Sequence, residues 1–398
     1  MSVRELVEAE ATAAADAAAA LTDEGATAAL GAAAELLGAR AEAVLAANAE
    51  DVAAATGLDA GALDRLRLDA ARLDAMREQL AATAALPPLE REVASWTLAS
   101  GLRVSERRIP IGVVGANFEA RPNVAVDVAA QLLKSRNAGV LRTGGAALRT
   151  VTALVDDVLR PALGRAGLPP AAIGLVRTAD REGARALCSL PGLVPLVILR
   201  GSGETTAALQ RVAAEHGVRT LAHAEGGGVL YVHAAADLAR ARAVVAASLD
   251  RLGVCNRLNL LLVDRGIDPA PLLAGLGVEA TGERGREWAN EPERVATVSV
   301  AAVAGVEEAL RIANRETSGL AAGIVSEDAE AARAFLDGYR GTAAFWHAPT
   351  RFADGFALTG APETGIEVGR SPGPRGPVTY RDLWLRQYRV MGDGTQHR

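Results

Sequence analysis

Hydrophobic positions along the chain repeat with two different periods, and the first change of period falls near residue 90. From residue 2 to about residue 86, apolar residues recur at spacings of three and four, which predicts helices. One such series is Ala26, Leu30, Ala33 and Leu37. Thr22 is suited to cap the start of one helix. Residues 96–108 then alternate between apolar and polar positions, which predicts a β-hairpin.

From residue 109 onward, strand-like and helix-like segments alternate, which predicts a parallel sheet with helices on both of its faces. The strands are expected over residues 109–115, 139–142, 173–177 and 193–199, and the helices over residues 124–134, 146–163, 181–187 and 204–216. Ligands in such sheets bind outside the carboxyl ends of the strands.

Three loops follow those carboxyl ends, and each is polar or contains glycine. They span residues 115–123, 143–145 and 200–203. Glycines at these places let backbone N–H groups approach a phosphate, with help from the helix that follows. The glycine spacing matches neither the dinucleotide-binding fingerprint nor the Walker loop, so spacing by itself does not identify a nucleotide site.

A second alternating series follows the glycine-rich residues 222–228 and predicts a second α/β domain. Its strands are expected over residues 229–233, 258–263, 296–300, 321–325 and 342–346, and its helices over residues 237–252, 270–275, 303–315 and 328–338. A glycine-rich tail over residues 350–377 leads to an alternating segment at 380–391. We expect this last segment to be a strand that pairs with the 96–108 hairpin or with a partner subunit.

Composition restricts the partners and the compartment. The chain has 398 residues, half of them hydrophobic, which favours two or three domains. A net charge of −6 without a basic run argues against nucleic acid. Neither a signal peptide nor a membrane-spanning apolar run is found. The two cysteines make no disulfide framework and fit a cytoplasmic protein, and the five histidines lack the spacing of metal ligands.

Two single residues are candidates for chemistry. Cys255 lies on the connection between a predicted helix and a predicted strand, beside Gly253 and between Arg251 and Arg257. That position suits an exposed nucleophile with a favoured thiolate; the alternative is a small buried hydrophobic residue. Lys134 is the only lysine in the chain. It is either a chance survivor of a bias toward arginine or a position where arginine does not fit.

Several ordered motifs resemble the glutamate-5-semialdehyde dehydrogenase family, whose members are also called gamma-glutamyl phosphate reductases. The longest matches are residues 108–115, the segment Phe118-Glu119-Ala120-Arg121-Pro122-Asn123-Val124, and residues 133–138. Val254-Cys255-Asn256 matches the family's nucleophile segment. Shorter matches follow at residues 287–291, 313–315, 318–319, 350–355, 365–366 and 375–377, so the resemblance covers nearly the whole chain.

The resemblance implies an aldehyde dehydrogenase-like α/β fold with β oligomerisation arms. It implies an NADP-binding, Rossmann-like domain over residues 1–225, with the N-terminal helices and the hairpin arm at about 96–108. A catalytic α/β domain carrying Cys255 would span residues 226–348, and residues 349–398 would form a C-terminal loop region with an oligomerisation strand. The implied partners are a small acyl phosphate or aldehyde and a second copy of the chain, in a dimer or tetramer.

The activity implied is the NADPH-dependent reduction of gamma-glutamyl phosphate to glutamate 5-semialdehyde and phosphate, in proline biosynthesis, through a thioester on Cys255. The resemblance carries over catalytic roles to Cys255, Asn256 and Asn123. It carries over cofactor-binding roles to Arg142, Gly144, Gly201, Ser202 and Glu291, and substrate-binding roles to Glu119, Arg121, Thr350 and Arg351. Arg121 is expected to bind a phosphate or carboxylate; the alternative is a structural ion pair.

The chain also departs from the family pattern, at Pro195, Val229, His347 and Pro372. We expect these departures to lie around the substrate, which would favour a divergent paralogue acting on another acyl phosphate or aldehyde. A third hypothesis is a catalytically silent partner subunit. Glu225 precedes a run of glycines, as does the water-activating glutamate of hydrolytic aldehyde dehydrogenases, but a phosphate-releasing reductase needs no such base.

Overall fold

The N-terminal part of the chain is helical, as its periodicity predicts. The computed structural model describes residues 1–58, 60–201, 203–223, 226–284, 294–369 and 373–396. The helices are α1 (Val3–Ala18), α2 (Asp23–Ala39), α3 (Ala41–Ala54), α4 (Ala60–Leu66) and α5 (Ala70–Ala85). The Thr22 hydroxyl accepts the Gly25 N–H at 2.9 Å, so the predicted cap of α2 is confirmed.

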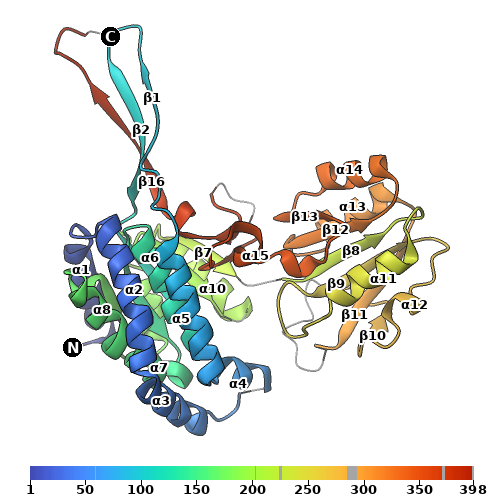
Figure 1. Ribbon diagram of the computed structural model, residues 1–398, viewed down its shortest axis with the longest axis horizontal. Helices are drawn as coiled ribbons and strands as arrows, with labels where there is room; N and C mark the ends of the chain where they lie inside the picture. The colour runs from blue at the N-terminus through green and yellow to red at the C-terminus, as the bar shows by residue number, and fades with distance from the viewer. Residues whose placement is uncertain (59, 202, 224–225, 285–293, 370–372, 397–398) are drawn as a thin grey trace.

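The next part of the chain forms a parallel sheet in the order β5-β4-β3-β6-β7. Its strands are β3 (Val113–Phe118), β4 (Ala138–Thr143), β5 (Ile173–Leu175), β6 (Leu196–Arg200) and β7 (Arg219–His223). The connecting helices are α6 (Pro122–Lys134), α7 (Leu148–Ala153), α8 (Arg160–Arg165), α9 (Glu182–Leu187) and α10 (Gly203–Glu215), with a π-helix at Leu154–Leu159. The N-terminal helices share one hydrophobic core with this sheet, and α2 and α5 lie beside α6 (Figure 1).

A second parallel sheet has the order β10-β11-β9-β8-β12-β13. Its strands are β8 (Gly228–Val232), β9 (Leu258–Asp264), β10 (Glu279–Thr281), β11 (Thr297–Val303), β12 (Ala321–Val325) and β13 (Ala343–Trp346). The helices α11 (Leu238–Ala247) and α12 (Ala270–Leu273) pack on one face, and α13 (Val306–Arg315) and α14 (Ala329–Gly338) pack on the other. Central strands buried on both faces explain why they read as continuous apolar runs.

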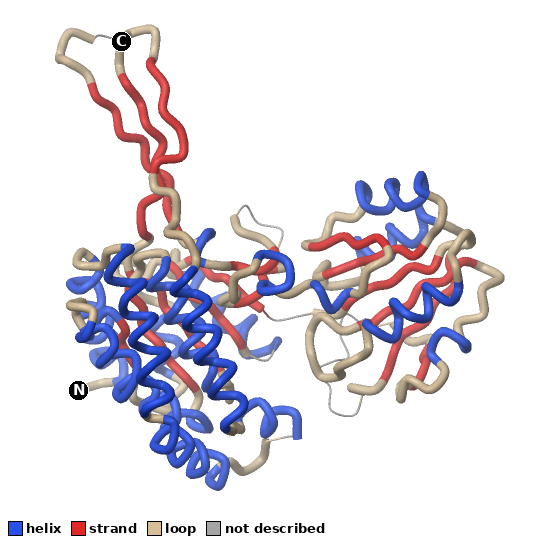
Figure 2. The backbone as a smooth tube through the Cα atoms, viewed as in Figure 1, coloured by secondary structure: helices blue, strands red, loops and turns tan. Residues whose placement is uncertain are grey.

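The end of the chain returns to the first sheet and then leaves it in a long arm. A short helix, α15 (Gly355–Thr359), is followed by the antiparallel pair β14 (Gly365–Glu367) and β15 (Gly376–Val378). The arm combines β1 (Glu92–Thr97), β2 (Arg103–Pro110) and β16 (Trp384–Met391), all antiparallel, and it projects from the body (Figure 2). The expected pairing of the C-terminal strand with the hairpin is confirmed.

Several predicted boundaries are wrong, and four strands were missed. The helix expected over residues 237–252 ends at Ala247, because Ser248 caps it and Gly253 takes a left-handed φ of 75°. The first strand begins at Val113, since Ile109 and Pro110 belong to β2. Two of the missed strands, β7 and β10, are short edge strands without a clear alternation. The other two, β14 and β15, are strands of three residues in the glycine-rich tail.

No helix in the described residues is long and apolar enough to cross a membrane. The same residues hold no group of three or more His, Cys, Asp and Glu side chains arranged to bind a metal ion.

Candidate active site

The first sheet reverses its strand order between β3 and β6, which is where ligands bind in sheets of this type. Phe118 at the end of β3 pairs in register with Arg200 at the end of β6. Residues 119–121 and residue 201 therefore leave the sheet side by side. On the other side of β3, Phe118 pairs with Thr143 at the end of β4. The strand order thus brings together all three loops that the sequence analysis selected.

The loop after β3 has a constrained shape. Ala120 takes a left-handed φ of 45°, which a residue with a Cβ rarely adopts, and Pro122 then begins α6. Across from it, a Cβ added to Gly201 would lie 3.4 Å from the carboxylate carbon of Glu119. The Glu119 carboxylate therefore lies against the backbone of the Gly201 turn, and a side chain at residue 201 would crowd it.

Arg121 supplies a positive charge close to the cysteine. The pKa of its guanidinium is lowered to about 10, chiefly by burial and also by the charges of Arg200 and Arg65. The charges of Cys255 and Glu119 act in the opposite direction. Arg121 therefore stays protonated at neutral pH. Because a Coulomb interaction is mutual, its charge also stabilises negative charge on the Cys255 sulfur.

Cys255 is half-buried on the turn between α11 and β9, at the amino edge of the second sheet. The glycines before β8 pack directly against this turn. The Gly227 N–H donates to the Cys255 carbonyl at 2.6 Å, and a Cβ on Gly226 would lie 2.6 Å from both the Cβ and the carbonyl oxygen of Cys255. The glycine run therefore has a packing reason: only a residue without a side chain fits at 226.

The second flanking cation does not act as predicted. The guanidinium of Arg257 is fully buried and donates to the carbonyl oxygens of Leu258 and Thr297, at 2.8 and 2.7 Å. A charge that does act on Cys255 is that of Arg121, which is far away in sequence, so chain neighbours alone do not reveal it.

Asn256 connects the cysteine turn to the C-terminal segment. Its side-chain amide donates to the carbonyl oxygens of Arg351 and Ala353, at 3.0 and 3.2 Å, and its Oδ1 accepts from Arg351. Its carbonyl accepts the Thr350 hydroxyl at 2.8 Å. The Asn256 side chain is thus a positioning group for the turn.

Thr350 and Arg351, which are predicted to bind substrate, contact the cysteine turn. Thr350 is fully buried, its hydroxyl is bonded to the Asn256 carbonyl, and its N–H donates to the Ser248 hydroxyl at 3.1 Å. Arg351 pairs with Asp250 at 2.7 Å as well as with Asn256. Both residues hold the cysteine turn in place, and their contact with substrate stays a prediction.

The glycine-bearing loops of the first sheet have room for a phosphate-containing group. A Cβ at Gly144 would meet open space, and α10, which spans 13 residues, begins directly after the Gly201 turn. Arg142 lies at the end of β4 and donates to Asn117 Oδ1 and to the carbonyl oxygens of Ala179 and Asp180. Its buried Nε has no hydrogen-bond partner among the described residues. Ser202 and Glu291, also predicted to bind cofactor, lie outside the described residues.

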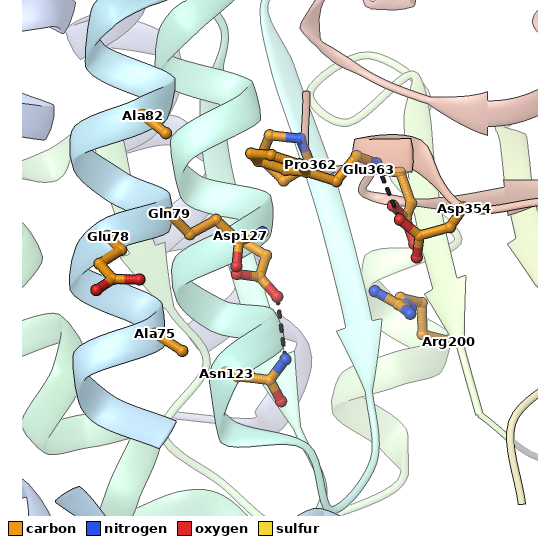
Figure 3. Close-up of a pocket in the computed structure, with 11 residues that line it drawn as sticks. Ala75, Glu78, Gln79, Ala82, Asn123, Asp127, Arg200, Asp354, Pro362 and Glu363 are labelled. Atoms are coloured by element: carbon orange, nitrogen blue, oxygen red, sulfur yellow. Dashed lines mark hydrogen bonds between the residues drawn. The ribbon is translucent and has the colours of Figure 1, made fainter. Parts of the chain in front are cut away.

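A polar cavity of about 500 Å³ lies between α5, α6, the end of β6 and the segment around α15 (Figure 3). It is lined by Ala75, Glu78, Gln79, Ala82, Asn123, Asp127, Arg200, Asp354, Phe356, Pro362 and Glu363. Asn123 donates to Asp127 Oδ2 at 3.0 Å, along one face of α6. The predicted catalytic residue Asn123 therefore faces this cavity.

Asp127 carries the most perturbed carboxyl group of the cavity. Its pKa is raised from 3.8 to about 7, chiefly by burial and also by the charge of Glu363. The charge of Arg200 and the hydrogen bond from Asn123 act in the opposite direction. Sequence reasoning missed Asp127, Arg200 and Glu363. The spacing of four residues between Asn123 and Asp127 on a predicted helix was a usable signal, since it puts both on one face.

Comparison with known proteins identifies the family. The sequence model of the aldehyde dehydrogenase family matches residues 1–277. The gamma-glutamyl phosphate reductase of Gluconobacter oxydans is 36% identical over 381 residues, which covers 86% of this chain and 86% of that protein. The enzyme of the same name from Sphingopyxis alaskensis is 39% identical over 366 residues, 86% of this chain and 84% of that protein. This chain belongs to the gamma-glutamyl phosphate reductase family.

Solved structures agree with the family assignment. The crystal structure of gamma-glutamyl phosphate reductase from Thermotoga maritima has a TM-score of 0.89 at 28% identity, and the match covers 98% of this chain and all of that one. An acetylating aldehyde dehydrogenase from Geobacillus thermoglucosidasius, at 17% identity, has a TM-score of 0.70 over 100% of this chain and 97% of that one, and shows the fold alone. The predicted aldehyde dehydrogenase-like fold is confirmed, and it implies a nicotinamide cofactor.

Two of the departures from the gamma-glutamyl phosphate reductase pattern lie away from Cys255. Pro195 precedes β6, at the opposite end of that strand from Arg200. His347 follows β13, and its Nε2 accepts the Ser326 N–H at the carboxyl edge of the second sheet, whereas Cys255 lies at the amino edge. Val229 is buried and follows Gly228, whose N–H donates to the Arg257 carbonyl in the cysteine turn. Pro372 lies outside the described residues, and the expectation that the departures lie around the substrate stays a prediction.

Lys134 has a structural explanation. It is 2% exposed, and its ammonium donates to the Ala84 carbonyl at 3.0 Å and to the Thr27 hydroxyl at 3.3 Å. Burial lowers its pKa. It lies 11 residues beyond Asn123 on α6, about 16 Å at the rise of a helix. Lys134 therefore joins α6 to the N-terminal helices and is remote from the cavity.

The second cysteine differs sharply from the first. Cys188 is fully buried, and burial raises the pKa of its thiol to about 12. It therefore remains a neutral, unreactive thiol at neutral pH. Glu225, the residue compared with a water-activating base, lies outside the described residues.

Proposed function

We propose that this protein reduces gamma-glutamyl phosphate to glutamate 5-semialdehyde with NADPH, releasing phosphate, as a step of proline biosynthesis. The observation that carries the proposal is the half-buried Cys255 on a turn that the glycines at 226 and 227 and the Asn256 side chain hold in place. The charge of Arg121 acts on this thiol. A thiol that feels a guanidinium charge suits a substrate that is both an acyl electrophile and an anion. The names of the relatives support the choice of substrate.

The chemistry assigns a separate task to each residue. The Cys255 thiolate attacks the carbonyl carbon of the acyl phosphate and forms a C–S bond. The C–O bond to phosphate then breaks, and its electron pair leaves with the phosphate, which Arg121 pairs with and so stabilises. Backbone N–H groups at Cys255 and Asn256 are suited to stabilise the oxyanion that forms before phosphate leaves. The resulting thioester is a better hydride acceptor than a carboxylate.

The cofactor is proposed to lie over the first sheet. Gly144, Gly201 and the start of α10 offer backbone N–H groups to its phosphates. The buried guanidinium of Arg142 favours the negative charge of NADP over NAD, although its terminal nitrogens already hold residues 179 and 180. When bound, the nicotinamide supplies the hydride.

The arm supports the expected homo-oligomer. The exposed apolar residues of its strands are Val93, Trp96, Leu385, Tyr388, Val390 and Met391. A three-stranded ribbon that exposes this many large apolar side chains is suited to cover a second copy of the chain. The cytoplasmic location stays a prediction.

An assay in the oxidative direction tests the proposed function. We expect glutamate 5-semialdehyde to reduce NADP only when inorganic phosphate is present, with a higher kcat/KM for NADP than for NAD. Folded protein that shows no turnover with this substrate would contradict the proposal. Turnover with a different aldehyde in a panel, under the same conditions, would favour the paralogue hypothesis instead.

A further inference from the structure

The cavity described above adjoins the turn that carries the candidate nucleophile. The side-chain amide of Asn256, the residue after Cys255, donates to the Ala353 carbonyl at 3.2 Å, and the next residue, Asp354, lines the cavity. Arg200 also lines the cavity, and it pairs in register with Phe118 at the end of β3, just before the loop that carries Arg121. The C-terminal segment therefore links the cysteine turn to the cavity.

The cavity presents carboxylates from several elements and one guanidinium. Glu78 comes from α5, Asp127 from α6, and Asp354 and Glu363 from the C-terminal segment, while Arg200 is the one cation of its lining. Figure 3 shows Asp127 and Asn123 on α6 facing Glu363 and Arg200 across the cavity. Such a lining is selective for a ligand that bears a positive charge.

Two of the carboxylates are already used by the protein. Asp354 accepts the Phe356 and Ala357 N–H groups at 3.0 and 3.2 Å, and so caps α15. Glu363 accepts the Gly355 N–H at 2.9 Å, through one of its two oxygens.

Asp127 and Arg200 retain unused hydrogen-bonding capacity. Asp127 is only 9% exposed, and among the described residues its carboxylate accepts a side-chain hydrogen bond only from Asn123. The Nε of Arg200 is buried without a hydrogen-bond partner among the described residues. Buried polar groups left in this way are normally satisfied by something that binds to them. Here the two groups carry opposite charges, so the complementary ligand carries both charges as well.

We propose that this cavity is the subsite for the α-amino-acid head of the substrate, with Asp127 receiving the ammonium group and Arg200 receiving the carboxylate. Asn123 holds the Asp127 carboxylate in position, and the free oxygen of Glu363 faces the same ammonium group. A volume of about 500 Å³ is enough for a small polar head with its waters. The inference rests on the proposed function, and it specifies which residues distinguish an amino-acid semialdehyde from a plain aldehyde.

The electrostatics of the empty cavity are consistent with this assignment. The pKa of Asp127 is raised to about 7, so about half of the carboxyl groups are protonated near neutral pH. An ammonium ion placed beside Asp127 favours the ionised form. The groups that face Asp127 are Arg200 on β6, Glu363 and Asp354 in the C-terminal segment, Glu78 on α5 and Asn123 on α6. Binding of the head group is therefore expected to weaken as pH falls below 7.

The test compares an amino-acid aldehyde with an analogue that lacks the amino group. Wild-type protein, Asp127→Asn and Asp74→Asn are assayed with glutamate 5-semialdehyde and with 5-oxopentanoate. Asp74 is an exposed residue on α5, and it provides the same chemical change outside the cavity. We expect Asp127→Asn to reduce the preference for the amino substrate by about 10- to 100-fold, the range for loss of a charge-assisted hydrogen bond. The Asp74→Asn variant is expected to keep the wild-type preference.

A second measurement is independent of turnover. Alkylation of Cys255 by iodoacetamide is measured by mass spectrometry. L-Glutamate is expected to protect Cys255 in the wild-type protein but not in Asp127→Asn. Glutarate, which lacks the amino group, is expected to protect neither protein. Equal kcat/KM losses for both aldehydes in Asp127→Asn, or equal protection by glutamate and glutarate, would overturn the subsite while leaving the proposed function intact. Protection by L-glutamate without any turnover of the semialdehyde would support the subsite and contradict the proposed function.

Discussion

The buried carboxyl group of Asp127 predicts an unusual dependence of stability on pH. Its pKa is about 7 in the folded protein and takes the ordinary value of 3.8 when the chain is unfolded. Below pH 3.8 the group is protonated in both states and does not change the free energy of unfolding. As pH rises from 3.8 to 7 the unfolded chain ionises while the folded protein keeps its proton, so the folded state progressively loses relative stability.

The magnitude follows from the shift. One pKa unit corresponds to 1.36 kcal/mol, so a shift of about three units destabilises the wild-type fold by about 4 kcal/mol at pH 8. At pH 5 only part of this cost has developed, about 2 kcal/mol. Asparagine resembles the protonated acid in shape and can still accept the hydrogen bond from Asn123. Asp127→Asn is therefore expected to be more stable than wild type, by a margin that grows between pH 5 and pH 8.

Urea unfolding of wild type, Asp127→Asn and Asp74→Asn at several pH values checks this. The Asp127→Asn variant should gain about 2 kcal/mol more over wild type at pH 8 than at pH 5. The exposed Asp74→Asn control should follow the wild-type dependence. Parallel stability curves for Asp127→Asn and wild type across this range would refute the claim that Asp127 is an uncompensated buried acid.

Two further predictions concern packing. Gly226→Ala should lower kcat by more than about 10-fold, because the added Cβ would lie 2.6 Å from the Cβ of Cys255. Gly31→Ala is the control, since its Cβ meets nothing within 4 Å, and it should leave kcat unchanged. Equal rates in the two variants would contradict the packing argument. Lys134→Met should lower the free energy of unfolding by about 1–3 kcal/mol, since it leaves the Ala84 carbonyl unpaired. The KM of the variant should equal that of the wild type, and a change in KM would indicate that Lys134 acts at the site.

The pattern of the sequence predicted the secondary structure of the central strands well, because strands buried on both faces carry long apolar runs. It missed β7 and β10, which lie at sheet edges and carry little hydrophobic signal. It also extended the helix before Cys255 by five residues, since apolar residues continue into the turn. The constraint that ends the helix is tertiary: residues 226–228 and 350–353 pack against that turn.

The candidate site was only partly predictable for the same reason. Cys255 and residues 119–123 were selected from motifs, but the charge interaction between Arg121 and Cys255 depends on how the chain folds, because the two residues are far apart in sequence. Thr350 carried a family match, and that match did not indicate whether it touches substrate or, as observed, supports the backbone of Asn256. Apart from Asn123, the groups that face Asp127 come from other elements, such as β6 and the C-terminal segment, so no local pattern reveals them.

The most direct test of the whole account compares the two cysteines. Cys255→Ser and Cys188→Ala are assayed for phosphate-dependent reduction of NADP by glutamate 5-semialdehyde, after their folding is verified by circular dichroism. Cys255→Ser should lose at least about 1,000-fold in kcat, because no thiolate is present to form the thioester. Cys188→Ala should keep its activity. Full activity in Cys255→Ser, or equal losses in the two variants, would contradict the assignment of Cys255 as the residue that carries the acyl group.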